Sequence, residues 1–518
     1  MNDKNKPGME FQVNIRNAGS KQSEANINTD TPFYIAVLGN FSGQPNQPNS
    51  KERPLAQRKL IAIDRDNFDQ VLARFKLSIN ISPTEQSGDN IAIDIAELDD
   101  FHPDALYEKL EAFSKLRSIR RRLKDKSSFD AAAAEIMGWL VEDQKAEKST
   151  SETQNICQDA DIPQGNLLDN ILDSTQTSAS SLESITSPDG VDRLVKQIIA
   201  PYVEPATNPR QQEMLDAVDE ATAEYMRQIL HHSHFQHLEA AWRSLYFLIS
   251  RVETGRDLKI FLLDVSKQEL EVDLANDVNM SALHKLFCEP AINDIPWSLL
   301  VGNYAFEDKI DDVLLLAQIG SLANSAQAVF LASAKETLAG CDSFAQYSDA
   351  DDWHYDLKPG VENVWKMLRQ DPVADCISLA LPRFLLRAPY GKKSRPIEAF
   401  TFEEISGKVA SCHDCLLWGN SAFIKAEQLA RAFAENHWNM RAVDAAQTDN
   451  LPMYYYDDDG EILLMPCAEI YLTEKGARKL YEQGLIAIWS VKNMDSVRSK
   501  GFNALSVNGK DLQGRWVR

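Results

Sequence analysis

Four histidines stand within seven residues of this sequence, in the string HHSHFQH that begins at His231. If this stretch is helical, His234 and His237 share one face, as a pair of metal ligands would. No cysteine or carboxylate lies at a spacing that would complete a tetrahedral site. We therefore favour a packed or capping helix junction. A metal-dependent enzyme that uses the cluster from His231 to His237 is the remote alternative.

Two further motifs are incomplete. Cys412 and Cys415 have the C-x-x-C spacing of zinc and redox sites, but the sequence has no second such pair to complete a zinc site. The string GKKS at Gly391 resembles the end of a phosphate-binding loop, yet the glycine required five positions earlier is Leu386. Zinc or redox chemistry and a nucleotide site are therefore the less favoured alternatives, and the sequence predicts no catalytic residue, metal or cofactor.

An acidic run, residues 457–459, is followed by Gly460 and lies between the aromatic residues 454–456 and the apolar residues 462–464. Two strand-like segments joined by Asp and Gly residues are typical of a β-hairpin. The run predicts a hairpin turn, with calcium binding as the less favoured alternative.

The string ALPRFLLRAPYG, residues 380–391, places two arginines in an apolar segment between two prolines. Pro382 and Pro389 disfavour helix at the residues before them, so the segment reads as extended or bent backbone. A guanidinium costs too much free energy to bury unpaired, so Arg383 and Arg387 need acceptors or access to water. We predict a structural role for both.

Composition excludes several classes of partner. The formal net charge of -23 argues against nucleic acid and against anionic membrane surfaces, since both need Lys and Arg to neutralise phosphates. No segment has the roughly 18 to 20 consecutive apolar residues that span a bilayer, and no apolar signal segment follows the N-terminus. The seven cysteines are scattered and form no disulfide framework. These features predict a reduced, cytoplasmic protein without membrane insertion.

The periodicity of the chain predicts four parts. Residues 1–30 are a polar, disordered N-terminal arm, and residues 31–140 carry strand and helix patterns. Residues 141–190 are an acidic flexible linker with a short helix near 166–172. Residues 191–518 alternate helices with apolar strands, which favours an α/β (α+β) fold with mixed sheets covered by helices.

Several strings in the last part resemble the large subunit of the type VI secretion contractile sheath (TssC/VipB-like). These are ILHH at 229–232, FQHLEAAWRSL at 235–245, LKI at 258–260, the string at 380–391, FTFEE at 400–404 and LWGNSAF at 417–423. The residues taken as the structural signature are Trp242, Arg243, Arg383, Arg387 and Trp418.

Residues 31–140 resemble the small sheath subunit (TssB/VipA-like). The similarity is in VLGNF at 37–41, RPL at 53–55, IDRDNFD at 63–69 and the helical pattern after Phe101. The chain therefore resembles a fusion of the two subunits, with the fold of their heterodimer inside one polypeptide. A linker of fifty flexible residues spans roughly 40 Å, enough to let the halves meet.

The resemblance implies a non-enzymatic, mechanical protein. In that family, heterodimers stack into a tube that contracts around an inner tube, and terminal arms exchange strands between neighbours. The implied partners are sheath subunits, the baseplate, the inner tube and an AAA+ unfoldase. The unfoldase grips a short helix near the start of the large subunit, and Leu167, Leu168 and Ile171 are the candidates for it.

Two roles remain open within this class. Large subunits continue beyond the point that matches Trp489, so the large-subunit half is expected to be shortened at its C-terminus. A shortened half without exchange arms favours a component that docks on, caps or adapts the sheath. A polymerising sheath wall subunit is the alternative.

Overall fold

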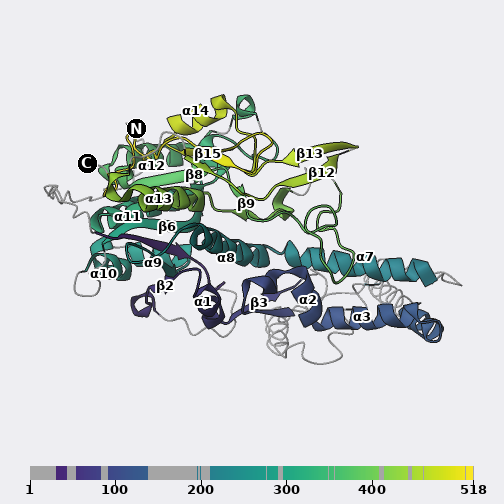
Figure 1. Ribbon diagram of the computed structural model, residues 1–518. Helices are drawn as coiled ribbons and strands as arrows, with labels where there is room; N and C mark the ends of the chain where they lie inside the picture. The colour runs from purple at the N-terminus through teal and green to yellow at the C-terminus, as the bar shows by residue number, and fades with distance from the viewer. Residues whose placement is uncertain are drawn as a thin grey trace, which may run out of the picture.

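The computed structural model describes residues 31–43, 54–82, 91–137, 195, 199, 211–275, 277–289, 296–347, 349–354, 356–407, 413–440, 446–458, 460–507 and 509–516. One large sheet has helices on both faces, and a pair of long helices runs away from it (Figure 1). This arrangement confirms the predicted α/β class with a mixed, helix-covered sheet. In these ranges no helix combines the length and the apolar character that crossing a membrane requires.

Among the described residues the main sheet has nine strands, in the order β11-β15-β14-β8-β7-β6-β1-β5-β2. Neighbouring strands from β14 to β5 are parallel, and the remaining pairs at the two edges are antiparallel. The strand bounds are β1 Phe33–Gly39, β2 Ile61–Ile63, β5 Leu258–Asp264, β6 Trp297–Phe306, β7 Val329–Ala334, β8 Ile377–Leu381, β11 Ala446–Thr448, β14 Ile486–Ser490 and β15 Val497–Ser499.

Strand β1 lies inside this sheet although it comes from the small-subunit-like region. It pairs in parallel with β5, where Phe33 faces Leu258, and on its other side with β6. A strand covered on both sides and both faces is expected to be almost entirely apolar, and β1 reads FYIAVLG. Gly39 is the last residue of β1. A Cβ at this position would lie 2.8 Å from the Phe41 ring and 2.9 Å from Asn303 Cβ, which leaves no room for a side chain.

The two faces of the sheet belong to two hydrophobic cores. Alternate residues of a strand point to opposite faces, so Phe33, Ile35 and Val37 enter one core while Ala36 and Leu38 enter the other. The first core is covered by α1 (Phe68–Phe75), α8 (Ser233–Arg251) and α13 (Ala422–Asn436). The second is covered by α9 (Lys267–Leu274), α10 (Ala282–Cys288), α11 (Ile310–Ser325), α12 (Pro359–Gln370) and α14 (Glu474–Glu482).

A helical arm extends the first core beyond the sheet. It consists of α2 (Pro103–Lys109) and α3 (Glu111–Lys124), with α3 lying beside α7 (Gln211–Leu230) in Figure 1. The sequence pattern after Asp104 predicts one helix, but Leu110 between α2 and α3 is extended, with φ -80° and ψ 131°. At the other end of α3, the Gln211 side-chain amide donates to the carbonyls of Leu123 and Lys124, which satisfies acceptors left free by the helix.

Three small two-stranded sheets complete the described structure. They are β3 (Leu77–Ile81) with β4 (Ile91–Ile95), β9 (Phe384–Leu385) with β10 (Trp418–Gly419), and β12 (Tyr454–Asp458) with β13 (Glu461–Met465). The last is the hairpin predicted from the acidic run, and it projects from the body of the molecule (Figure 1).

Candidate functional site

The segment with the two arginines follows β8 directly and crosses toward α8. Its backbone turns at the cis peptide between Leu381 and Pro382, then pairs through β9 with β10. Beyond β9, the Leu386 N–H donates to the Leu417 carbonyl at 3.0 Å. The segment is thus extended, as its prolines predict.

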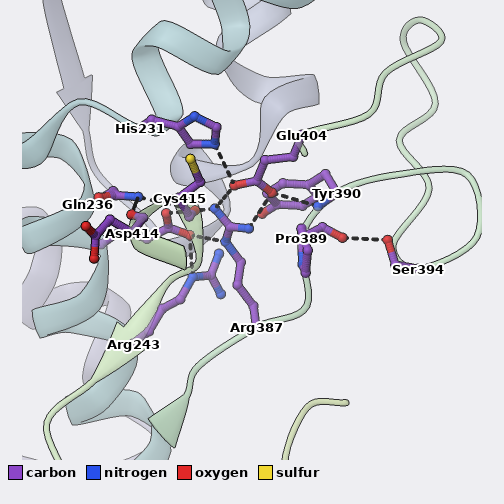
Figure 2. A network of polar contacts seen from close by, with 11 residues as sticks. His231, Gln236, Arg243, Arg387, Pro389, Tyr390, Ser394, Glu404, Asp414 and Cys415 are labelled. Atoms are coloured by element: carbon purple, nitrogen blue, oxygen red, sulfur yellow. Dashed lines mark hydrogen bonds and ion pairs between the residues drawn. The ribbon is translucent and has the colours of Figure 1, made fainter. Parts of the chain in front are cut away.

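Arg387 lies at the centre of a buried ion cluster (Figure 2). Its side chain is 3% exposed, and those of Glu239 and Glu404 are 0% and 1% exposed. Arg387 Nε and Nη2 donate to the two carboxylate oxygens of Glu239, at 2.8 and 3.3 Å. Nη1 and Nη2 donate to those of Glu404, at 2.8 and 3.0 Å. One guanidinium is therefore held by two forked carboxylates, the geometry that Arg favours over Lys.

Arg243 balances the charge of this cluster. It stands one turn after Glu239 on α8, and its Nε donates to Glu239 Oε1 at 2.7 Å. Burial alone would raise the pKa of Glu239, but the adjacent Arg387 and Arg243 guanidinium groups hold it below its usual value. Arg243, Arg387, Glu239 and Glu404 together carry no net charge, which is the condition under which such groups are tolerated in a core.

Tyr390 and His231 close the cluster on its outer side. The Tyr390 N–H donates to Glu404 Oε2 at 2.7 Å, and its ring centroid lies 4.3 Å from Arg387 Cζ. His231 Nε2 is 3.8 Å from Glu404 Oε1. Burial lowers the pKa of His231, although Glu404 opposes that shift. The imidazole therefore favours its neutral form in the folded protein.

Arg383 belongs to a second, more exposed cluster. Its guanidinium pairs with Glu469, and its side chain is 35% exposed while that of Glu469 is 4% exposed. His413 Nε2 lies 2.9 Å from Glu469 Oε1, and the Trp418 indole N–H donates to the His413 carbonyl at 3.0 Å. Burial raises the pKa of Glu469, but Arg383 and His413 outweigh that effect and bring it to about 2.

The histidine string forms a junction between two helices. Helix α7 ends at Leu230, and His232 is the N-terminal cap residue of α8, so His231 and His232 lie between them. The rings of His232 and His234 are 5.2 Å apart. In the described ranges no group of three or more His, Cys, Asp or Glu side chains is arranged to hold a metal ion. The placement agrees with the favoured helix-junction interpretation; Cys412 lies outside the described residues.

Trp242 connects the small-subunit-like region with α8. Its indole N–H donates to the Phe41 carbonyl at 2.9 Å. Its ring meets those of Phe41, Phe68 and Phe75 edge-on, with centroids 5.5, 5.8 and 5.2 Å away. Phe41 follows β1, and Phe68 and Phe75 begin and end α1. Trp242 is fully buried, so one side chain carries a large apolar contact between the two regions.

Further contacts run along the same boundary, which we call the junction. Each pairs a residue from positions 31–140 with one from positions 191–518. The ring pairs are Phe33–Phe433, Phe101–Phe235, His102–Tyr390, Tyr107–Phe400 and Phe113–Tyr225. The polar pairs are Arg58–Glu269, Arg120–Asp219 and the Asp104 carboxylate with the N–H groups of Glu398 and Ala399. Because His102 packs on Tyr390, the junction reaches the edge of the Arg387 cluster.

The five predicted signature residues thus fall in three places. Arg387 and Arg243 share one cluster, Arg383 and Trp418 share another, and Trp242 lies in the junction. Leu167, Leu168 and Ile171 lie outside the described residues. Sequence reasoning missed the acidic partners Glu239, Glu404 and Glu469. Two of these stand inside strings already singled out, FQHLEAAWRSL and FTFEE, so the need of Arg387 for carboxylates was the signal that could have found them.

Comparison with family models matches the two regions separately. Residues 212–506 match the tail sheath N-terminal domain family of VipB and EvpB. Residues 10–153 match the type VI secretion system VipA family.

Two curated relatives come from Pseudomonas aeruginosa. The chain is 30% identical over 305 residues to the type VI secretion system sheath protein TssC1, covering 57% of this chain and 61% of that protein. It is 29% identical over 119 residues to the sheath protein TssB1, covering 22% of this chain and 63% of that protein. Each alignment therefore spans less than two thirds of the relative's length.

Proposed function

This chain belongs to the type VI secretion tail sheath family, as a fusion of a TssB-like and a TssC-like region, and we propose that it works as a sheath heterodimer clasped within one polypeptide. In this proposal it is a structural component that docks on the contractile sheath as a cap or adaptor. Its activity is mechanical, not enzymatic.

The position of β1 is the observation that carries this proposal. A strand of the TssB-like region lies between β5 and β6, which both belong to the TssC-like region. On the outer side of β5, β2 adds a second strand from the TssB-like region. Removing β1 would split the main sheet and expose strand edges on both sides, so the two regions need one another to complete their cores.

The chemistry of the buried clusters supports a structural role. Arg387 uses Nε and both terminal nitrogens on the carboxylates of Glu239 and Glu404. A guanidinium engaged in this way stabilises the packing of β9, α8 and residues 400–404 against one another. It is not aimed at a substrate, which is what a catalytic or anion-binding arginine would require.

The short edge strands of the main sheet favour docking on the sheath over growth in which a neighbouring subunit pairs a strand with that sheet. In the described part of the sheet the two edges are β2 and β11, each three residues long. Short edges offer little backbone for a neighbouring strand to pair with. A polymerising wall subunit is the second candidate, and the presence of both sheath-family regions in one chain favours it.

The proposed partners follow from the family. They are the small and large sheath subunits, with the baseplate and the inner tube as further components of the same apparatus. An AAA+ unfoldase that recognises Leu167, Leu168 and Ile171 remains a prediction for a segment outside the described residues. The domain boundaries 31–140, 141–190 and 191–518 also remain predictions.

A cleavable chain tests the clasped heterodimer. A specific protease site inserted between residues 141 and 190 allows the two regions to be separated covalently after folding. We expect the cleaved halves to co-elute at submicromolar concentration. Trp242→Ala removes the central contact of the junction and should weaken the association of the cleaved halves at least about tenfold, since truncating a buried Trp costs about 3–5 kcal/mol.

Trp365→Ala is the matched control, because Trp365 is also buried but lies on α12 in the second core. It should destabilise the protein without selectively releasing the TssB-like half. Halves that separate in the parent protein and show no affinity for each other would refute the clasped heterodimer. Electron microscopy with authentic sheath subunits then distinguishes the two roles, since tubes formed by this protein alone would identify a wall subunit.

A further inference from the structure

Helix α3 and the two residues after it carry a dense run of positive charge on an acidic protein. Seven of the twelve residues 115–126 are Lys or Arg, with Asp125 as the one acidic residue, while the whole chain has a net charge of -23. Such a local reversal of sign is an electrostatic feature that can orient a charged partner.

Part of this charge is already neutralised inside the arm. Arg120 forms a forked pair with Asp219 on α7, at 2.5 and 2.9 Å, and Arg122 pairs with Glu135 at 2.6 Å. Arg117, Arg121 and Lys124 follow at the four- and three-residue steps that place side chains on one helix face. We call these three residues the basic stripe. Arg117 is half-buried, with its Cζ 5.0 Å from the Tyr107 ring centroid. Arg121 and Lys124 are exposed, and no ion pair joins either of them to another residue in the described part of the chain.

The turn of the β12–β13 hairpin carries negative charge together with exposed apolar side chains. Tyr455 is 53% exposed and Ile462 is 74% exposed, and Asp457 lies directly opposite Ile462. The Asp457 carboxylate accepts the Gly460 N–H at 2.8 Å, which fixes the turn. Glu461 is also exposed, but it pairs with Asp458 and therefore lies on the other face of the hairpin. We call Tyr455, Asp457, Glu461 and Ile462 the acidic hairpin tip. It combines carboxylates with an aromatic ring and an aliphatic side chain on a two-stranded element of marginal stability by itself.

We propose that the basic stripe of one copy docks on the acidic hairpin tip of a second copy of this chain. The proposal rests on the second candidate function, a polymerising wall subunit, and deepens it by naming a contact between neighbouring protomers. An arginine side chain can make two kinds of contact with this tip, because its guanidinium pairs with carboxylates and also packs on a tyrosine ring. A three-residue stripe on a chain with this net charge suits an acidic protein surface better than a nucleic acid.

The contact is head to tail. Each copy carries both surfaces, the stripe on the helical arm of the TssB-like region and the tip on a projecting hairpin of the TssC-like region (Figure 1). In a head-to-tail dimer one surface of each kind stays free, whereas reciprocal pairing about a two-fold axis would use both stripes and both tips and close the dimer. Further copies can add only to the head-to-tail dimer.

Charge reversal of the full-length chain tests this contact by sedimentation velocity. We expect self-association that is stronger at about 0.05 M than at about 1 M salt, because salt screens exposed charges. Arg121→Glu with Lys124→Glu should weaken it at least about tenfold, and Asp457→Lys with Glu461→Lys should do the same, as like charges then face each other. A protein with all four changes should recover the association.

Lys492→Glu with Lys500→Glu is the matched control. Both lysines are exposed, one in the turn after β14 and one directly after β15, and the double change alters net charge as much as the stripe variant does. Arg121→Gln with Lys124→Gln provides a second stripe variant if charge reversal disturbs α3. A parent protein that stays monomeric at every concentration, or a four-fold variant without recovery, would overturn the proposal. The proposal would also be overturned if the stripe variants changed self-association equally with and without the hairpin changes. That result would be expected if the stripe binds an acidic segment of its own chain. Co-elution of the cleaved halves is measured on the same variants, so failure of the clasped heterodimer is distinguished from failure of this contact.

Discussion

Arg383 and Arg387 are four residues apart on one segment, yet they lie in very different surroundings. Arg387 is 3% exposed and sits between two forked carboxylates, with a third partner in the Tyr390 ring. Arg383 is 35% exposed and pairs with the single carboxylate of Glu469, beside the Trp418 ring at 5.8 Å. Arginine is therefore part of the core at position 387 and part of a partly solvated ion pair at position 383.

Burial and the number of acceptors, rather than residue type, determine how much each arginine contributes to stability. Breaking a fully buried ion cluster leaves charges that water cannot reach. Breaking a partly exposed pair leaves charges that water can solvate in part. The two arginines should therefore respond to the same substitution with different losses of stability.

Arg387→Leu should have the largest effect. It removes the guanidinium between Glu239 and Glu404 and leaves an uncompensated buried charge, which costs about 3–5 kcal/mol. Urea unfolding measures the loss. Arg387→Lys is the control, because it restores the charge without the fork and should recover part of the stability. A loss below about 1 kcal/mol for the leucine variant would show that the cluster relaxes or takes up water.

Arg383→Leu should have a smaller effect, about 1–3 kcal/mol, because His413 still contacts Glu469 and solvent reaches the site. The same unfolding measurement applies. The losses of unfolding free energy in Arg383→Leu and Arg387→Leu can be compared directly, because both variants exchange the same side chain on the same segment. Equal losses would contradict the difference in surroundings.

The smallest effect is a dependence on pH that is specific to the Arg383 cluster. The pKa of Glu469 is lowered to about 2, from an ordinary value of 4.5. The ionised carboxylate therefore contributes stability above about pH 4.5 that is lost as the pH falls toward 2. The stability difference between the parent protein and Glu469→Gln should narrow as the pH falls through that window. A difference that does not change between pH 5 and pH 3 would contradict this assignment.

Local sequence patterns predicted much of the described fold. The apolar residues before Gly39 and the alternation of Ile91, Ile93 and Ile95 are strand patterns, and β1 and β4 form there. The hairpin predicted from the acidic run also forms, because each of these patterns depends on neighbouring residues. The break at Leu110 was not predicted, since the pattern on both sides of it is that of one amphipathic helix. Glu239 was missed because it lies 148 residues from Arg387, and sequence spacing does not reveal such a contact. Glu404 lies only 17 residues away, where the need of Arg387 for a carboxylate was the available signal.

The position of β1 between two strands of the TssC-like region could not be predicted from local sequence patterns either. A buried strand reads the same whether its neighbours come from its own region or from another one. Only the family resemblance suggested that the two regions associate. The structure adds how they do so, through one shared sheet rather than through two separate surfaces.

That shared sheet has a consequence for synthesis on the ribosome. Phe33 pairs with Leu258, which is translated 225 residues later. At roughly 5–20 residues per second, β1 waits about 10 to 45 s for its first sheet partner. Throughout that interval a nearly all-apolar strand is without its native neighbours, so the nascent chain should be a client of ribosome-associated chaperones. Slow codons or starvation for an amino acid between β1 and β5 would lengthen this vulnerable period and favour aggregation.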